Sequence, residues 1–230
     1  MKIVQVHAQI YLCEARDHID LNTSMVRLQE YYESSFPNIK GHYFTTDDFR
    51  TLYKNNNKGK YTYNEEWGGN NIPGHVIRDF YKTFPAKTRS AFETELKIFL
   101  NKRKLFQSNN HKKFYVIGIP QNHAVSFSHE LAHAFFYIFP TYKKKMLWYM
   151  EYMTKKTKKK ACKILKKEYG YTDGVLLDEL QAYLATETCY WLCDRFDLKP
   201  AEINWGMVFN IQQFYNYYRE KIPYLLDAGM

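Results

Sequence analysis

At its centre the chain reads Ser126-Phe127-Ser128-His129-Glu130-Leu131-Ala132-His133-Ala134-Phe135-Phe136. This stretch predicts a helix over about 124–139, in which residues four apart project from the same face. His129 and His133 can therefore offer ring nitrogens to one metal ion. Zinc lowers the pKa of a bound water to roughly 7. Glu130 is near enough to take the proton of that water without being a ligand itself.

The pattern resembles the zincin metallopeptidases. In that superfamily an edge strand precedes the active-site helix and hydrogen-bonds the extended substrate. The predicted strand Phe114–Pro120 is similar in position, so the resemblance implies β-augmentation of a peptide there. The metzincin continuation would require glycine at position 136 and histidine at 139. This chain has Phe136 and Phe139, which excludes that subclass.

A catalytic zinc needs a third protein ligand and leaves one position for water. No histidine follows His133, which favours a carboxylate. The resemblance implies a glutamate from a later helix, as in the gluzincins. The segment 177–185 is similar to that second helix, with an acidic pair followed by small and apolar residues. Glu179 is therefore the expected ligand, and Ala182 would permit close helix approach.

Several other residues are candidates for this site. Asp178 and Glu187 compete with Glu179 as the third ligand, although Asp178 can instead accept the second N–H of a ligating histidine. The oxyanion of the transition state usually needs a donor besides zinc. The possible donors are Tyr171, Tyr183, His75 and His123. The resemblance covers roughly residues 113–190, and the N-terminal hundred residues are expected to define the substrate.

The order of elements predicts a single α+β domain over 1–230, zincin-like, with a small mixed or antiparallel sheet and a helical second half. Residues 1–112 form the N-terminal part and 113–230 the catalytic part. Strands are predicted at 2–12 and 114–120. Helices are predicted at 25–34, 47–54 (capped by Asp47 or Asp48), 75–84, 88–104, 124–139, 142–169, 174–195 and 206–221.

The segment 55–74 is rich in Asn, Gly and Lys and predicts a loop, with a brief strand at 60–63 as an option. Its end, Trp67–Gly74, can be interpreted as a mobile lid over a cleft, because glycines permit hinge motion. A surface turn is the preferred interpretation.

The net charge of +9 comes from one window. Between Thr141 and Glu168 the chain has eleven lysines and two acids, and the rest is balanced. The segment Lys143–Lys167 predicts one amphipathic helix. It is either a solvated face or a surface for nucleic acid, an acidic membrane or an acidic protein. The lysines of this basic patch are Lys143, Lys144, Lys145, Lys155, Lys156, Lys158, Lys159 and Lys160. Aromatic residues suited to base stacking are scarce in its lysine-dense half, which favours phosphate contacts.

The cysteine spacing and the length of the apolar segments indicate the cellular compartment of the protein. Cys13, Cys162, Cys189 and Cys193 lack disulfide-framework spacing, and the last two are interpreted as buried reduced thiols. The longest apolar run, 134–140, is too short to span a membrane, and the N-terminus lacks the apolar stretch of a signal peptide. We therefore expect a cytoplasmic protein, or one of a host cytosol.

These features together predict a zinc metallopeptidase of the HExxH…E type acting on an intracellular protein. The alternative is a zinc-binding regulatory or nucleic-acid-binding protein with a basic helix and no peptidase activity. The presence of Glu130 favours the enzyme, because a structural zinc has no need of that carboxylate.

Overall fold

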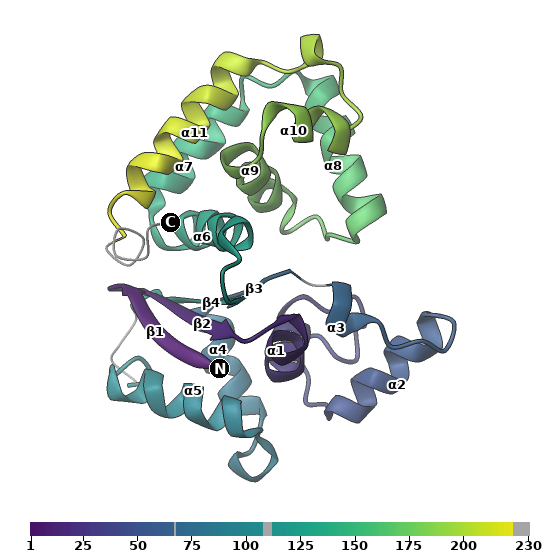
Figure 1. The fold of residues 1–230 in the computed structure, drawn as a ribbon, viewed down its shortest axis with the longest axis vertical. Helices are drawn as coiled ribbons and strands as arrows, with labels where there is room; N and C mark the ends of the chain where they lie inside the picture. Colours follow the sequence, from purple (N-terminus) through teal and green to yellow (C-terminus); the bar gives the residue numbers. More distant parts are fainter. Residues whose placement is uncertain (67, 108–111, 223–230) are drawn as a thin grey trace. The chain divides into compact units, whose positions relative to one another are not determined.

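A computed structural model of the chain describes residues 1–66, 68–107 and 112–222. The chain divides into two compact units, Met1–Ser126 and Phe127–Met230. The first unit contains all the strands that the described residues form, and the second consists of helices and their connections (Figure 1). The predicted α+β class is therefore confirmed. That the two units act as a single domain stays a prediction.

The first unit is built on a mixed four-stranded sheet in the order β1-β2-β4-β3. Its strands are β1 (Lys2–His7), β2 (Ile10–Ala15), β3 (Asn70–Pro73) and β4 (Tyr115–Pro120). The segment predicted as one strand over 2–12 is an antiparallel hairpin, in which Lys2 faces Glu14. Apolar residues occur throughout both arms, and no Gly or Pro marks the turn, so the sequence does not reveal the reversal.

Strand β4 is an interior strand, and the expectation that it forms a free edge is wrong. It pairs with β2 in parallel along its whole length, and Tyr115 to Gly118 also pair with β3. All six of its residues are buried, as is typical of a strand covered on both faces. It also belongs to the first unit, although the sequence groups it with the catalytic half. A peptide therefore cannot pair with Tyr115–Gly118 without displacing β3.

Three of the described helices of the first unit begin at a side-chain cap. Helix α1 starts well before the predicted residue 25, because Asp17 accepts a hydrogen bond from the Asp20 N–H at 2.7 Å. Helix α2 begins after Thr45, which forms a capping box with Asp48, so the predicted aspartate supports the cap without occupying it. The helices are α1 (His18–Glu33), α2 (Thr46–Asn56), α3 (Tyr63–Glu66), α4 (Gly74–Thr83), η1 (Ala86–Thr88) and α5 (Ala91–Lys102).

The segment predicted as a loop contains helix α3 and strand β3. The brief strand expected at 60–63 is absent, and β3 lies at 70–73 instead. The preferred interpretation of a surface turn is also wrong, since Ile72 is fully buried. Gly74 lies so close to the Phe114 ring that a Cβ would clash with it, and its N–H donates to the Phe114 carbonyl at 2.7 Å. Nothing in this packing supports a lid; Trp67 lies outside the described residues.

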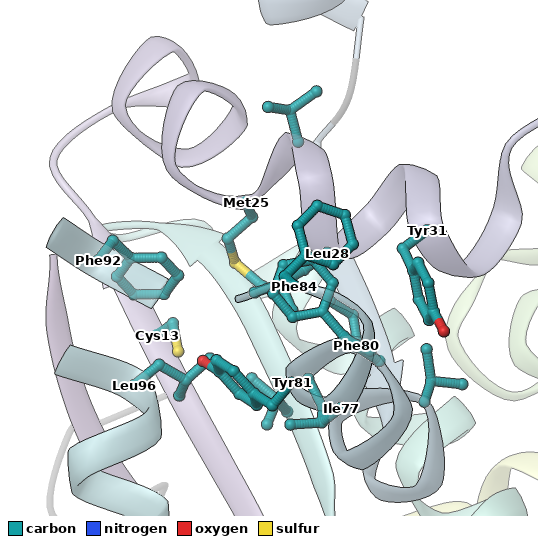
Figure 2. Close-up of a cluster of buried hydrophobic side chains, with 14 of the residues drawn as sticks. Cys13, Met25, Leu28, Tyr31, Ile77, Phe80, Tyr81, Phe84, Phe92 and Leu96 are labelled. Carbon is teal, nitrogen blue, oxygen red and sulfur yellow. The ribbon is translucent and has the colours of Figure 1, made fainter. Parts of the chain in front are cut away.

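The core of the first unit takes alternate residues from β2 and buried faces of α1, α4 and α5. Figure 2 shows Cys13 of β2 next to Tyr81 of α4 and Leu96 of α5. The other labelled members are Met25, Leu28, Tyr31, Ile77, Phe80, Phe84 and Phe92. The alternation along β2 therefore explains how one short strand can be buried on this face.

The second unit contains only helices, and it breaks two of the predicted ones. The segment 142–169 forms two helices, because the Thr154 side chain accepts from the Thr157 N–H and starts a new helix. The segment 174–195 is likewise divided by Thr188, which caps the next helix. The helices are α6 (Ala124–Ile138, starting just before the unit boundary), α7 (Pro140–Met150), α8 (Lys155–Tyr169), α9 (Leu176–Thr186), α10 (Cys189–Arg195), η2 (Pro200–Glu202) and α11 (Trp205–Arg219).

Among the described residues no helix is both long and apolar enough to cross a membrane.

Candidate metal site

Three side chains predicted as ligands come together within the second unit. His129 and His133 project from α6, and their Nε2 atoms are 3.2 Å apart. Glu179 of α9 reaches both rings, with Oε2 3.7 Å from His129 Nε2 and Oε1 3.6 Å from His133 Nε2. Among the described His, Cys, Asp and Glu residues, this is the group that can hold a metal ion.

The geometry of these donor atoms suits a tetrahedral zinc. Bonds of roughly 2.0–2.1 Å at tetrahedral angles put neighbouring donors about 3.3 Å apart. The two imidazole nitrogens are 3.2 Å apart, each lies 3.6–3.7 Å from a different oxygen of Glu179, and one ligand atom from each residue fits within 4.8 Å. Glu179 is buried, and its Oε2 atom has no hydrogen-bond partner among the described residues. A buried carboxylate oxygen without a partner costs free energy, and a cation would satisfy it. Two imidazoles and one carboxylate therefore fit zinc as donors.

Asp178 supports the site and is not part of the ligand group. Its Oδ1 atom is 2.9 Å from His133 Nδ1, so the ring donates this N–H to the carboxylate. Burial lowers the pKa of His133, but Asp178 and Glu179 outweigh it and hold the pKa well above its usual value. Burial raises the pKa of Glu179, whereas His133 and His129 bring it below its usual value. The histidines and the carboxylates of this cluster therefore stabilise each other's charged forms.

Gln181 fixes α9 against α6, and the sequence analysis missed it. Its side chain is fully buried, and its Nε2 donates to the Ala132 carbonyl at 3.2 Å and to Asp178 Oδ1 at 3.1 Å. Its Oε1 accepts from the Tyr142 hydroxyl at 3.3 Å. Ala182, the next residue, is also buried. The signal that could have revealed Gln181 is a lone amide within the apolar positions of that helix.

Glu130 and two tyrosines surround the ligands. Glu130 is buried, and its carboxylate contributes to raising the pKa values of His133, Tyr171 and Tyr183. Burial, Glu179 and Tyr183 raise the pKa of Tyr171 far above its usual value. The Tyr183 ring lies 4.6 Å from the His129 ring, centroid to centroid. The predicted base and both predicted tyrosines therefore share this cluster.

The remaining candidates are not members of the ligand group. Glu187 is half-buried at the C-cap of α9 and outside the ligand group; burial raises its pKa, and His129 partly counteracts this. It lines a pocket of about 380 Å³, whose lining includes Ser128 but none of the three ligands. The pocket is lined by Ser128, Ala185, Thr186, Glu187, Thr188, Cys189, Gln212, Tyr215, Asn216 and Arg219. His75 and His123 belong to the first unit.

The predictions for the basic segment and for the cysteine pair of the second unit are wrong. The basic segment Lys143–Lys167 is not one helix, since its lysines divide between α7 and α8. Cys189 is exposed and Cys193 is half-buried, so the expectation of buried thiols is wrong for this pair. Cys189 follows the cap at Thr188, which turns the start of α10 toward solvent.

Comparison of the chain with protein-family models, with curated proteins and with solved structures found no match.

Proposed function

We propose that this chain is a zinc-dependent metallopeptidase that hydrolyses peptide bonds of an intracellular protein substrate. The zinc ligands are His129, His133 and Glu179, in an arrangement similar to that of the gluzincins. One observation carries the proposal: ligand atoms of these three side chains lie within 4.8 Å of one another, and a buried oxygen of the Glu179 carboxylate has no hydrogen-bond partner among the described residues.

Zinc held there supplies a Lewis acid, which stabilises negative charge and lowers the pKa of water. Glu130 performs the proton transfers. Its carboxylate accepts a proton from the attacking water and delivers it to the nitrogen of the leaving amine. Its buried position beside His133 supports this role, because a carboxylate shielded from bulk water keeps the proton within the site.

The two tyrosines stabilise the developing negative charge. Phenol hydroxyls are donors of the kind that stabilise an oxyanion, and Tyr171 and Tyr183 lie beside the ligands. The second unit also has a pocket of about 380 Å³ that is lined by Ser128, the residue before His129 in the chain, and we propose that it takes a substrate side chain. A peptide requires both features, a polarised carbonyl and room for the adjoining side chain.

A single substitution distinguishes enzyme from binding protein. Glu130→Gln keeps the size of the side chain and removes the base, so the variant is expected to bind zinc at one equivalent and to cleave nothing. Zinc is measured by elemental mass spectrometry, and cleavage by profiling the peptides released from a cytosolic extract. Exposed Glu168→Gln is the matched control and retains cleavage. Wild-type protein that binds zinc and releases no peptides would instead support the zinc-binding regulatory protein.

A further inference from the structure

A second pocket of the second unit lies away from the ligand cluster, where α7 ends and α11 begins. It has a volume of about 330 Å³. Its walls are three aromatic residues, two asparagines and two small or flexible apolar residues: Trp148, Tyr149, Tyr152, Asn204, Gly206, Met207 and Asn210. None of these residues takes part in the candidate metal site.

The aromatic wall of this pocket is unusually open to solvent. Trp148 is 42% exposed and Tyr152 is 54% exposed. The Trp148 ring lies 5.1 Å from both the Tyr149 and the Tyr152 ring, centroid to centroid, so the three form one cluster. Exposed aromatic clusters are costly in water and commonly mark binding surfaces. Rings of this kind are platforms on which unpaired nucleic-acid bases stack.

One lysine lies against the aromatic cluster, and a lysine-rich helix begins beside the pocket. The Lys145 amine is 3.9 Å from the centroid of the Trp148 ring. The lysine-rich helix α8 is fastened beside the pocket, since Thr157 donates to the Glu202 carbonyl at 3.0 Å and Lys156 pairs with the Glu202 carboxylate at 3.5 Å. Figure 1 shows the end of α7, the start of α8 and the start of α11 meeting at one corner of the second unit.

Helix α8 carries a row of lysines for which the described residues provide no acidic partner. Lys156, Lys160 and Lys166 have acidic partners in Glu202, Asp197 and Asp173. Within the described part of the chain, four exposed lysines at four-residue spacing have no ion pair: Lys155, Lys159, Lys163 and Lys167. Each step along this row is about 6 Å along the helix axis, so the row follows an extended chain of charges.

We propose that this corner binds single-stranded nucleic acid. Bases stack on Trp148 and Tyr152, the Asn204 and Asn210 amides face base edges in the pocket, and the lysine row contacts successive phosphates. A duplex is disfavoured because its bases are not free to stack on the protein. A membrane is disfavoured because Ala161 and Leu165 of α8 are fully buried and Ile164 is half-buried, so these apolar side chains are not free to insert.

The test uses the full chain and fluorescein-labelled oligonucleotides, dT20 and U20, followed by fluorescence anisotropy at several salt concentrations. We expect both to bind, and a duplex of the same length to bind more weakly. Trp148→Ala and Tyr152→Ala each weaken binding about tenfold, because one stacked base contributes roughly a factor of ten. Tyr190→Ala, at an 83% exposed tyrosine on α10, is the control and leaves binding unchanged.

The lysine row is tested through the salt dependence. The double variant Lys155→Gln/Lys159→Gln is expected to lower the slope of log affinity against log salt by about 0.7 for each lost phosphate contact. Exposed Lys54→Gln/Lys102→Gln in the first unit removes the same charge and leaves the slope unchanged. Equal affinity for inorganic polyphosphate or for vesicles rich in phosphatidylserine would overturn the proposal, and so would full binding by Trp148→Ala. Circular dichroism verifies that each variant is folded.

Discussion

Asp178 Oδ1 and His133 Nδ1 lie 2.9 Å apart, and this contact leaves the Nε2 atom of His133 directed toward His129. A carboxylate on one ring nitrogen fixes the tautomer and orientation of the ring, and it makes the other nitrogen a better ligand. Gln181 holds Asp178 in turn, at 3.1 Å. Orientation of the metal ligands therefore depends on a relay between two helices.

The contact between Asp178 and His133 predicts that loss of the Asp178 carboxylate weakens metal binding without abolishing it. Asp178→Ala removes the acceptor of the His133 N–H and is expected to weaken zinc binding by about 10- to 100-fold, with the fold intact. Competition with a chromophoric zinc chelator measures the change. Asp173→Ala, at an exposed acid on the same connection into α9, is the control and keeps wild-type affinity. Unchanged affinity in Asp178→Ala would show that the contact does not orient the ligand.

Substitution of the third ligand, Glu179, is expected to cause a larger loss of zinc affinity. Glu179→Gln keeps the volume of the side chain but replaces an anion with a weaker, neutral donor, so stoichiometric zinc binding is expected to disappear at micromolar zinc. The control is Glu187→Gln, eight residues later at the C-cap of α9 and outside the ligand group. The zinc content of both variants is measured by elemental analysis after dialysis. A Glu179→Gln protein that retains one zinc, or a Glu187→Gln protein that loses it, would contradict the assignment.

The parts of this site that the sequence could predict depend on local geometry. His129 and His133 are four residues apart on one helix, and helix geometry alone brings them together. Glu179 is distant in sequence and was accessible only through the missing downstream histidine and the acidic pair before Ala182. Gln181 was not predicted, because its role depends on which residues of α6 face it.

The fold was predictable to a similar extent. Helices α4, α6 and α11 have long apolar stripes, and their positions are confirmed to within a few residues. Strand β3 was missed because it consists of Asn70-Asn71-Ile72-Pro73, which is strand only through its pairing with β4. The breaks at Thr154 and Thr188 were missed because a new cap can start a helix without disturbing the apolar pattern.

The stability of the protein is expected to depend strongly on the buried ion pair between Arg27 and Glu93 in the first unit. Arg27 and Glu93 are joined by two hydrogen bonds, and their side chains are only 7% and 2% exposed. Glu93→Ala leaves a buried guanidinium that keeps a hydrogen bond to the Thr88 carbonyl and its contact with the Phe84 ring but has lost its counter-charge, so the free energy of unfolding is expected to fall by about 3–5 kcal/mol. Urea unfolding followed by circular dichroism measures it.

A matched surface pair gives the contrast. Lys82 and Asp79 are 2.8 Å apart but largely exposed, so Asp79→Ala is expected to cost less than about 1 kcal/mol. The double variant Arg27→Met/Glu93→Leu removes both buried charges and is expected to recover much of the loss. Similar losses for Glu93→Ala and Asp79→Ala would mean that burial does not govern the energetics of the Arg27–Glu93 pair.

Position 118, in the sheet, has no room for a side chain. It lies in β4 where α1 packs on the sheet, and a Cβ there would overlap Met25 Sδ and come within 2.9 Å of Leu21 Cδ1. Both neighbours are fully buried, so they have little room to move. Gly118→Ala is therefore expected to lower the free energy of unfolding by about 1–3 kcal/mol.

The cause of that loss can be isolated in a double-mutant cycle. If the overlap with Met25 causes it, Gly118→Ala should cost much less in a Met25→Ala background, where the space has been opened. Gly174→Ala is the control for a general glycine effect, because a Cβ there meets nothing within 4 Å, and its cost should stay within about 0.5 kcal/mol. Equal costs of Gly118→Ala in both backgrounds would show that Met25 does not set the limit, and that the strand backbone itself resists the substitution.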